Sequence, residues 1–276
     1  MPKYGMVIDL QRCVGCGACA IACKTENNTQ DRMKGQTFNW ADFVYKTEGK
    51  FPDVRFTAIP VLCNHCTDAP CIKVCPVTPK AMHKHKNGMT IHNQERCIGC
   101  RLCQEACPYS TQDVDESKAA YSVISFNDDS DETHGFYKDD KELIKGCTAS
   151  GAEISKRAGN TPPHRTLYKH SDYADVRRKG VVEKCIFCEH RVLHGELPYC
   201  VVACPSKARI FGDLEDKNSE ASQLLKKYKA ANLKNHKGEF LKSGEKGTRP
   251  NVYYIRSFKA AAKIVQKESS LRDLKE

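Results

Sequence analysis

Short apolar runs, separated by long polar stretches, make up the hydrophobic pattern of this chain. Weak alternation over residues 4–9 predicts a strand, and β-rich runs at 88–92, 121–126 and 208–211 predict three more. The run 252–255 (Val-Tyr-Tyr-Ile), shortly after Pro250, predicts a late strand. No stretch approaches the roughly 18 apolar residues of a transmembrane helix, so we expect no membrane span.

Two stretches carry helical character. The Ala-rich run 18–25 has high helix propensity. Residues 220–233 place apolar side chains at the i, i+3, i+4, i+7 spacing of one helix face: Ala221, Leu224, Leu225 and Tyr228. We expect this stripe to pack on the main body of the protein, and docking on a partner subunit is the alternative.

The composition indicates a small apolar core and a basic surface. Hydrophobic residues are 40% of the 276 residues even with 17 cysteines among them, and the mean hydropathy is −0.58. The net charge is +10, and the lysines concentrate in residues 217–276. We expect no nucleic-acid partner and assign the charge to a protein partner or to solvation. The first ten residues lack the apolar run of a signal peptide.

Sixteen of the 17 cysteines form four quartets, each opening with C-x2-C and closing with C-x3-C. The first and third quartets read C-x2-C-x2-C-x3-C, the run that holds cubane clusters in bacterial ferredoxins. Three quartets end in Cys-Pro. In chain order the quartets are Cys13, Cys16, Cys19, Cys23; Cys63, Cys66, Cys71, Cys75; Cys97, Cys100, Cys103, Cys107; and Cys185, Cys188, Cys200, Cys204.

Two other uses of cysteine explain this spacing poorly. Cysteines two or three residues apart are badly placed to form disulfides with each other. Four-thiolate zinc sites use two C-x2-C pairs separated by about a dozen or more residues, which leaves the C-x3-C endings unexplained. The quartets therefore predict four [4Fe–4S] clusters, and the clusters should staple a chain whose apolar core is thin.

The fourth cysteine of each quartet should cross to another cluster. In two-cluster ferredoxins three thiolates on one loop hold one cubane, while the fourth begins a helix that points toward the other cubane. This rule predicts cluster 1 at Cys13, Cys16, Cys19 and Cys204; cluster 2 at Cys185, Cys188, Cys200 and Cys23; cluster 3 at Cys63, Cys66, Cys71 and Cys107; and cluster 4 at Cys97, Cys100, Cys103 and Cys75.

The crossed ligands predict an α+β fold of two interleaved bacterial-ferredoxin-like lobes with loop-rich insertions. Residues 1–60 with 180–216 would form an outer lobe, in which 31–60 is a spacer. Residues 61–108, with the strand near 121–126, would form a central lobe. Residues 109–179 are a polar insertion, and residues 217–276 a basic C-terminal extension.

The motifs resemble those of one protein family. Cys13-Val-Gly-Cys-Gly-Ala-Cys19, Cys63-Asn-His-Cys-Thr-Asp-Ala-Pro-Cys71 and Cys97-Ile-Gly-Cys-Arg-Leu-Cys103 resemble the four-cluster electron-transfer subunit of molybdenum- or tungsten-bis-pterin oxidoreductases of the dimethyl-sulfoxide-reductase superfamily. Residues 5–10, 24–28, 51–54 and 249–258 look closest to the small subunits of respiratory arsenate, polysulfide and tetrathionate reductases. Nitrate-reductase-like members have tryptophan at the position of Cys100, so a full cubane is expected here.

The resemblance implies a non-catalytic subunit in anaerobic respiration. Its partners would be a large molybdenum- or tungsten-pterin catalytic subunit, near cluster 1, and a quinone-linked membrane anchor or soluble cytochrome at the far end. Electrons would pass clusters 1, 2, 3 and 4 in that order or its reverse. Co-export with the catalytic subunit would place the chain at the periplasmic face of the cytoplasmic membrane, and the cytoplasm is the alternative. A stand-alone polyferredoxin is the alternative function.

The sequence also gives expectations for the roles of several further residues. Cys147 is expected to be a free thiol. His65 lies within a cluster loop and either donates to a cluster sulfur or packs. His83, His85 and His92 are expected at the surface rather than at a metal or quinone site. Lys24, Lys73 and Lys184 would raise the potential of nearby clusters if they are not simply solvated, and the acidic run 128–132 is expected to be a solvated loop.

Overall fold

A computed structural model gives the structure of this protein. It describes residues 1–27, 29, 39–110, 122–127, 139–142, 144–159, 180–235, 237–239, 241 and 247–257. The acidic run from residue 128 onward therefore lies outside the described residues.

Short elements dominate the fold. The helices are α1 (Ala18–Asn27), α2 (Pro70–Lys73), α3 (Leu102–Ala106), α4 (Gly151–Ala158), α5 (Glu189–Val192), α6 (Tyr199–Val202) and α7 (Glu220–Lys227). The strands are β1 (Tyr4–Asp9), β2 (Ala41–Lys50), β3 (Asp53–Leu62), β4 (Met82–Lys84), β5 (Thr90–His92), β6 (Ser125–Asn127), β7 (Val181–Glu183), β8 (Arg209–Asp213), β9 (Ala230–Ala231) and β10 (Val252–Ile255). This mixture of helices and strands confirms the α+β class.

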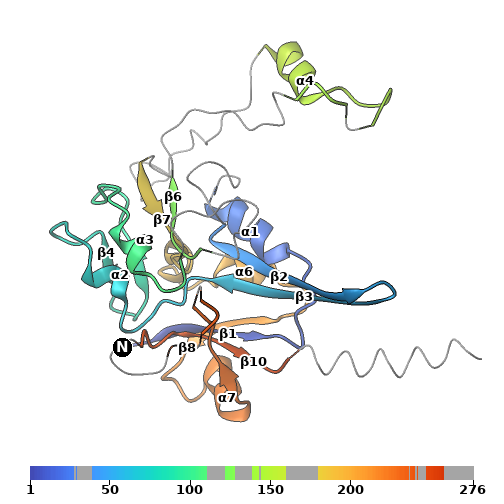
Figure 1. Ribbon diagram of the computed structural model, residues 1–276. Helices are drawn as coiled ribbons and strands as arrows, with labels where there is room; N and C mark the ends of the chain where they lie inside the picture. The colour runs from blue at the N-terminus through green and yellow to red at the C-terminus, as the bar shows by residue number, and fades with distance from the viewer. Residues whose placement is uncertain are drawn as a thin grey trace, which may run out of the picture.

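One four-stranded sheet joins the first strand of the chain to the last strand of the described residues. Its strand order is β8-β1-β10-β9, with β1 antiparallel to β8 and parallel to β10 (Figure 1). Because β1 lies between two strands and is covered on both faces, its apolar residues Met6, Val7 and Ile8 are fully buried. The pairing of β1 with β8 brings the first and last quartets to the same part of the molecule.

Two short antiparallel strand pairs lie next to the other quartets in the sequence. β4 pairs with β5 between the second and third quartets, and β6 pairs with β7. β6 follows the third quartet and β7 precedes the fourth, so this pair links the second half of the chain to its middle. Figure 1 shows α2, α3 and β4 on one side of the molecule and α1 and α6 on the other.

Residues 31–60, which the sequence predicts as a spacer, contain most of a long hairpin. β2 and β3 pair over their whole length, from Ala41 opposite Leu62 to Lys50 opposite Asp53. Alternating aromatic and β-branched residues from Phe43 onward are the sequence signal that identifies these strands. We call this hairpin the arm, because its outer half extends beyond the main body in Figure 1.

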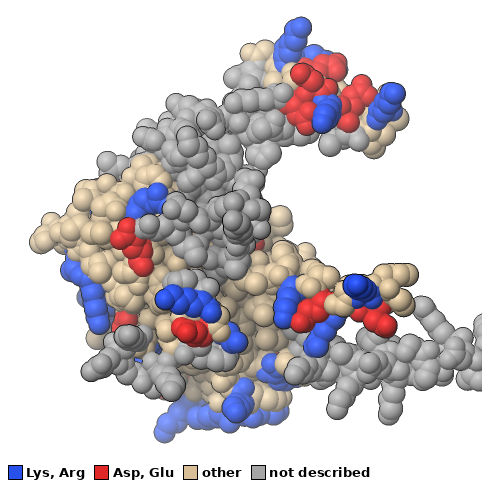
Figure 2. All heavy atoms as spheres, in the orientation of Figure 1, with Lys and Arg blue, Asp and Glu red and all other residues tan. Residues whose placement is uncertain are grey.

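The described parts of residues 217–257 belong to the main body rather than to an extension. The prediction of a separate basic extension is corrected here, since β10 lies inside the four-stranded sheet. The apolar stripe of α7 packs on the body, as expected, where Ala221 meets Val7, Ile210 and Ile255. The helix is shorter than expected: Tyr228 is already extended, at φ −123° and ψ 142°, and the chain continues into β9. Lysine and arginine side chains gather over α7 in Figure 2.

Cysteines are built into the core of the protein. One buried cluster contains Met6, Ile8, Leu62 and Phe187 together with cysteines of all four quartets. In Figure 1 α4, within the insertion, stands apart from this body. No helix among the described residues is long and apolar enough to cross a membrane.

Candidate iron–sulfur cluster sites

Twelve quartet cysteines line three cavities, and each cavity combines cysteines from two quartets. Site 1 is a cavity lined by Cys13, Cys16, Cys19 and Cys204. Site 3 is a cavity lined by Cys63, Cys66, Cys71 and Cys107. Site 4 is a cavity lined by Cys97, Cys100, Cys103 and Cys75. The structure thus brings together the thiols that the ferredoxin rule groups for clusters 1, 3 and 4.

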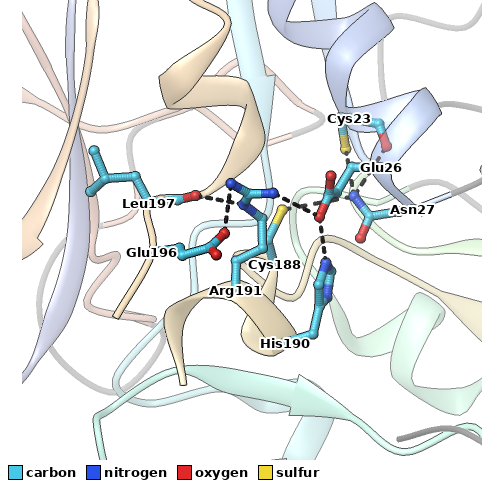
Figure 3. A network of polar contacts seen from close by, with 8 residues as sticks. All are labelled: Cys23, Glu26, Asn27, Cys188, His190, Arg191, Glu196 and Leu197. Atoms are coloured by element: carbon cyan, nitrogen blue, oxygen red, sulfur yellow. Dashed lines mark hydrogen bonds and ion pairs between the residues drawn. The ribbon is translucent and has the colours of Figure 1, made fainter. Parts of the chain in front are cut away.

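The remaining four cysteines, Cys23, Cys185, Cys188 and Cys200, meet as site 2. Burial raises the pKa of the Cys23 thiol well above its usual value, and the nearby thiols of Cys185, Cys200 and Cys188 raise it further. The Asn27 side-chain amide lies 3.5 Å from Cys23 Sγ and 3.9 Å from Cys188 Sγ, so it bridges the first and fourth quartets (Figure 3).

A polar network fixes α1 against α5 around site 2. Glu26 Oε1 at the end of α1 accepts from His190 Nε2 at 2.7 Å and from Arg191 at 3.4 Å (Figure 3). Arg191 also donates to the carboxylate of Glu196 at 2.7 Å and to the Leu197 carbonyl at 3.0 Å. These contacts hold the two halves of site 2 together although they are more than 160 residues apart in sequence.

Each quartet loop turns at the second residue after its first cysteine. The backbone φ is positive at Gly15 (68°), His65 (43°), Gly99 (72°) and Phe187 (55°). The N–H of this residue donates to the sulfur of that first cysteine, at 3.5 Å for His65 and 3.4 Å for Gly99 and Phe187, and Gly15 does the same for Cys13. Hydrogen bonds to ligand sulfurs are one of the means by which proteins tune cluster potentials.

The two turns without glycine support each other. The rings of His65 and Phe187 stack in parallel with centroids 3.6 Å apart, and both residues are buried. His65 Nδ1 accepts the N–H of Thr90 at 3.2 Å. The His65 ring therefore has a packing role between the second and fourth quartets, and this packing offsets the strain of two left-handed residues.

Replacement of Gly99 by alanine is expected to damage site 4. The new Cβ would lie 2.1 Å from the Gly180 carbonyl oxygen, and φ is +72°. Gly146 is a matched control, since its φ is +75° but no atom lies within 4 Å of the Cβ position. Both substitutions cost about 1–2 kcal/mol of left-handed strain, but only Gly99→Ala also displaces a quartet loop. Iron content and thermal unfolding measure the difference, and equal losses in both variants would disprove the role of the contact.

Burial keeps the most enclosed of these thiols protonated when no metal is bound. Burial first, and then neighbouring thiols, raises the pKa of Cys66 to about 12 and that of Cys188 to about 12. Four buried thiolates would repel one another unless cations bind between them. Iron binding supplies that charge and releases the protons, as in other metal-coupled folds.

Buried polar groups without protein partners face the three cavities. Arg209 Nε and Nη2 at site 1, the Asn64 side chain at site 3 and His92 Nε2 at site 4 form no hydrogen bond to described residues. Buried donors normally find an acceptor. The sulfides of a cluster would accept hydrogen bonds here, so the residues present fit an iron–sulfur cluster. Among the described residues, no three His, Cys, Asp or Glu side chains are arranged to hold a single metal ion.

The four sites form a row. Burial raises the pKa of Cys200 in site 2, and Cys19 of site 1 raises it further; burial and then Cys63 of site 3 do the same for Cys185 of site 2. Burial and then Cys71 of site 3 raise the pKa of Cys103 in site 4. All cysteines of sites 2 and 3 are buried, whereas Cys16 in site 1 and Cys100 in site 4 are exposed. The row therefore runs 1, 2, 3, 4, with solvent access at its two ends.

The structure also places the other residues for which the sequence provides an expectation. His92 is buried rather than at the surface, and burial followed by the Lys184 charge lowers its pKa to about 3, so it is uncharged. Lys73 is exposed, whereas Lys184 is only 1% exposed. Cys147 is an exposed free thiol, as expected. Sequence reasoning missed Arg209, since one arginine at the start of a predicted strand gives no sign of burial.

Comparisons with known proteins match this chain to iron–sulfur proteins. Residues 54–147 and 160–214 match the family described as "4Fe-4S dicluster domain", and residues 4–25 match "4Fe-4S binding domain". The arsenate respiratory reductase iron–sulfur subunit of Shewanella sp. is 47% identical over 93% of this chain and 97% of its own length. The putative dimethyl sulfoxide reductase iron–sulfur subunit of Halobacterium salinarum is 35% identical over 92% and 79%. A tetrathionate reductase subunit of Salmonella typhimurium is 29% identical over 92% and 72%.

A row of cysteine sites with buried middle members and exposed ends defines a multi-cluster electron-transfer protein. The chain belongs to the family of four-cluster iron–sulfur subunits of molybdenum-containing reductases. It carries [4Fe–4S] clusters, and electron transfer within a respiratory reductase is its function.

Proposed function

We propose that each of the four sites binds one [4Fe–4S] cluster through three cysteines of one quartet and the last cysteine of another. The main support for this proposal is that three separate cavities are each lined by such a crossed set of four thiols. The same crossing makes two interleaved lobes, one holding sites 1 and 2 and the other holding sites 3 and 4. When bound, the clusters accept and release single electrons; the chain orders them, surrounds sites 2 and 3 with apolar residues and donates hydrogen bonds to their sulfurs.

We further propose that the partner is a large catalytic subunit of the arsenate-respiratory type, with a membrane-bound or soluble electron carrier at the other end of the row. The support is the 47% identity over 97% of the arsenate respiratory reductase iron–sulfur subunit. Sites 1 and 4 each have an exposed cysteine, whereas all cysteines of sites 2 and 3 are buried. Two different partners could therefore exchange electrons with the chain, one at site 1 and one at site 4.

An affinity-tagged form of this chain, expressed in its native anaerobic cells, is expected to bring down a large chain with molybdenum and pterin. In that complex, arsenate added after dithionite reduction should reoxidise the clusters, as seen by recovery of their visible absorbance. Tetrathionate, selenate and polysulfide, tested in parallel, should reoxidise them far more slowly. Purification of the tagged chain alone would instead indicate a diffusible polyferredoxin.

The location of the complex belongs to the same proposal. An exported catalytic subunit would carry this bound chain to the periplasmic face of the cytoplasmic membrane. Protease added to intact spheroplasts should then degrade the chain. Protection equal to that of a cytoplasmic marker protein would place the complex inside the cell instead.

A further inference from the structure

The outer half of the arm extends away from the main body. Its base is buried at Ala41 and Leu62, but most of its outer half is exposed, and no other described element covers that half (Figure 1). An isolated two-stranded hairpin is marginally stable in water. A contact with another molecule would therefore stabilise the outer half.

The two faces of the arm differ in chemistry. Phe43, Tyr45 and Phe56 share one face, where neighbouring rings stack with centroids 5.8 and 5.5 Å apart. Tyr45 is 55% exposed and Phe56 60% exposed, so most of this aromatic row is open to solvent. The opposite face is charged and includes the Lys46–Glu48 ion pair at 2.7 Å. Exposed aromatic surface of this kind marks protein interfaces.

The apolar face continues directly into site 1. Phe43 and Pro60 line the site 1 cavity together with its cysteines. Ala58 Cβ lies 3.0 Å from the position that a Cβ on Gly15 would take, so the arm touches the site 1 loop. Val14 on that loop is 71% exposed. A protein that covers the aromatic row would therefore also lie against the exposed edge of site 1.

We propose that the apolar face of the arm, together with Val14, is the docking surface for the stably bound catalytic subunit that exchanges electrons with cluster 1. A permanent subunit fits best because a preformed row of exposed aromatics suits an obligate interface, whereas transient redox contacts are small. The inference rests on the proposed function, because the occupant is its catalytic subunit.

The test uses the tagged complex and two matched variants. Tyr45→Thr with Phe56→Thr removes the aromatic row but keeps strand-forming residues. Lys46→Thr with Glu48→Thr changes the charged face of the same strand. The aromatic variant is expected to lose at least tenfold of the co-purifying large subunit while its iron content stays at the wild-type level. The charged-face variant should retain the large subunit.

The results of this test separate the docking proposal from the proposed function. If the aromatic variant retains the large subunit, or if both variants lose it equally, the docking proposal is overturned. A wild-type chain that elutes alone as a dimer, and becomes a monomer in the aromatic variant, assigns the arm to a second copy and also overturns it. If the wild-type chain brings down no pterin-containing subunit, the proposed function itself fails.

A second inference rests on the buried charge of Arg209. This side chain is 3% exposed, lines site 1 and places Nη1 3.9 Å from Cys200 Sγ of site 2. Its Nε and Nη2 atoms have no acceptor, and among the described residues no carboxylate forms an ion pair with it. The guanidinium therefore lies between two sites whose bound clusters are anionic.

We infer that Arg209 stabilises the added electron on clusters 1 and 2 and so raises the potentials of both. When an electron passes between them, one cluster is oxidised and the other reduced, and the cation stays close to the charge throughout. Replacement by glutamine should lower the reduced-to-oxidised ratio of these two clusters at least tenfold at a fixed solution potential. A tenfold change corresponds to about 59 mV for a one-electron couple.

EPR-monitored redox titration of the full chain measures this shift cluster by cluster. Arg209→Gln should move two of the four midpoint potentials, and Arg209→Lys should restore most of the shift by keeping the charge. Arg12→Gln is the matched control, since its side chain is 43% exposed and paired with Asp9. Iron content confirms that the clusters remain. Equal shifts in the Arg209→Gln and Arg12→Gln variants, or a uniform shift of all four clusters, would refute the inference.

Discussion

Removal of iron under anaerobic conditions is expected to unfold most of this protein. The cysteines are part of the core rather than attached to it, because one buried cluster contains thiols of all four quartets together with Met6, Ile8 and Phe187. Loss of the clusters would leave these buried thiols without their bonded partners, and in domains of this kind the free energy of metal binding is a large part of the free energy of folding.

Circular dichroism during chelation tests this expectation. The strand and helix signal should be lost in parallel with the cluster absorbance, and addition of iron and sulfide should restore both. A protein held in the same buffer without chelator is the control. A chelated protein that still unfolds cooperatively on heating would show that the apolar residues alone hold the fold.

Paired cysteine substitutions are expected to separate crossed sites from self-contained ones. Cys75 and Cys97 belong to different quartets but to the same site, whereas Cys75 and Cys63 belong to one quartet but to different sites. The Cys75→Ala, Cys97→Ala double variant should therefore lose one cluster and keep about 12 irons. The Cys75→Ala, Cys63→Ala double variant should lose two clusters and keep about 8 irons.

Cys147→Ala is the matched control, since this thiol is exposed and belongs to no quartet. It should keep about 16 irons. Iron and acid-labile sulfide analysis of anaerobic preparations gives the counts. If the Cys75/Cys63 variant keeps more iron than the Cys75/Cys97 variant, each quartet holds its own cluster and the crossed arrangement is wrong.

The turn of each cluster loop is predictable from the sequence because the residues that form it are neighbours in the chain. C-x2-C spacing and a glycine two residues after Cys13 and Cys97 define the loop turn within a few residues. The strands over 4–9 and 252–255 were also predicted at the bounds that the structure shows, because each is a short buried run. The grouping of Cys23 with Cys185 needed the ferredoxin rule, and the structure brings both thiols to one site.

Long-range features were not predictable in the same way. Nothing near Arg209 in sequence shows that its guanidinium is enclosed by Met6 and Cys200. The place of β10 inside the sheet depends on its parallel pairing with β1, more than 240 residues away, and local periodicity cannot reveal it. Burial of His92 likewise follows from the packing of β5 beside site 4.

Anomalous diffraction at the iron absorption edge from crystals of the iron-loaded protein tests the crossed clusters most directly. The account predicts four separate iron clusters, with Cys204 Sγ bound to the cluster of Cys13 and Cys107 Sγ bound to the cluster of Cys63. A cluster whose four ligands all come from one quartet, or fewer than four clusters, would contradict it.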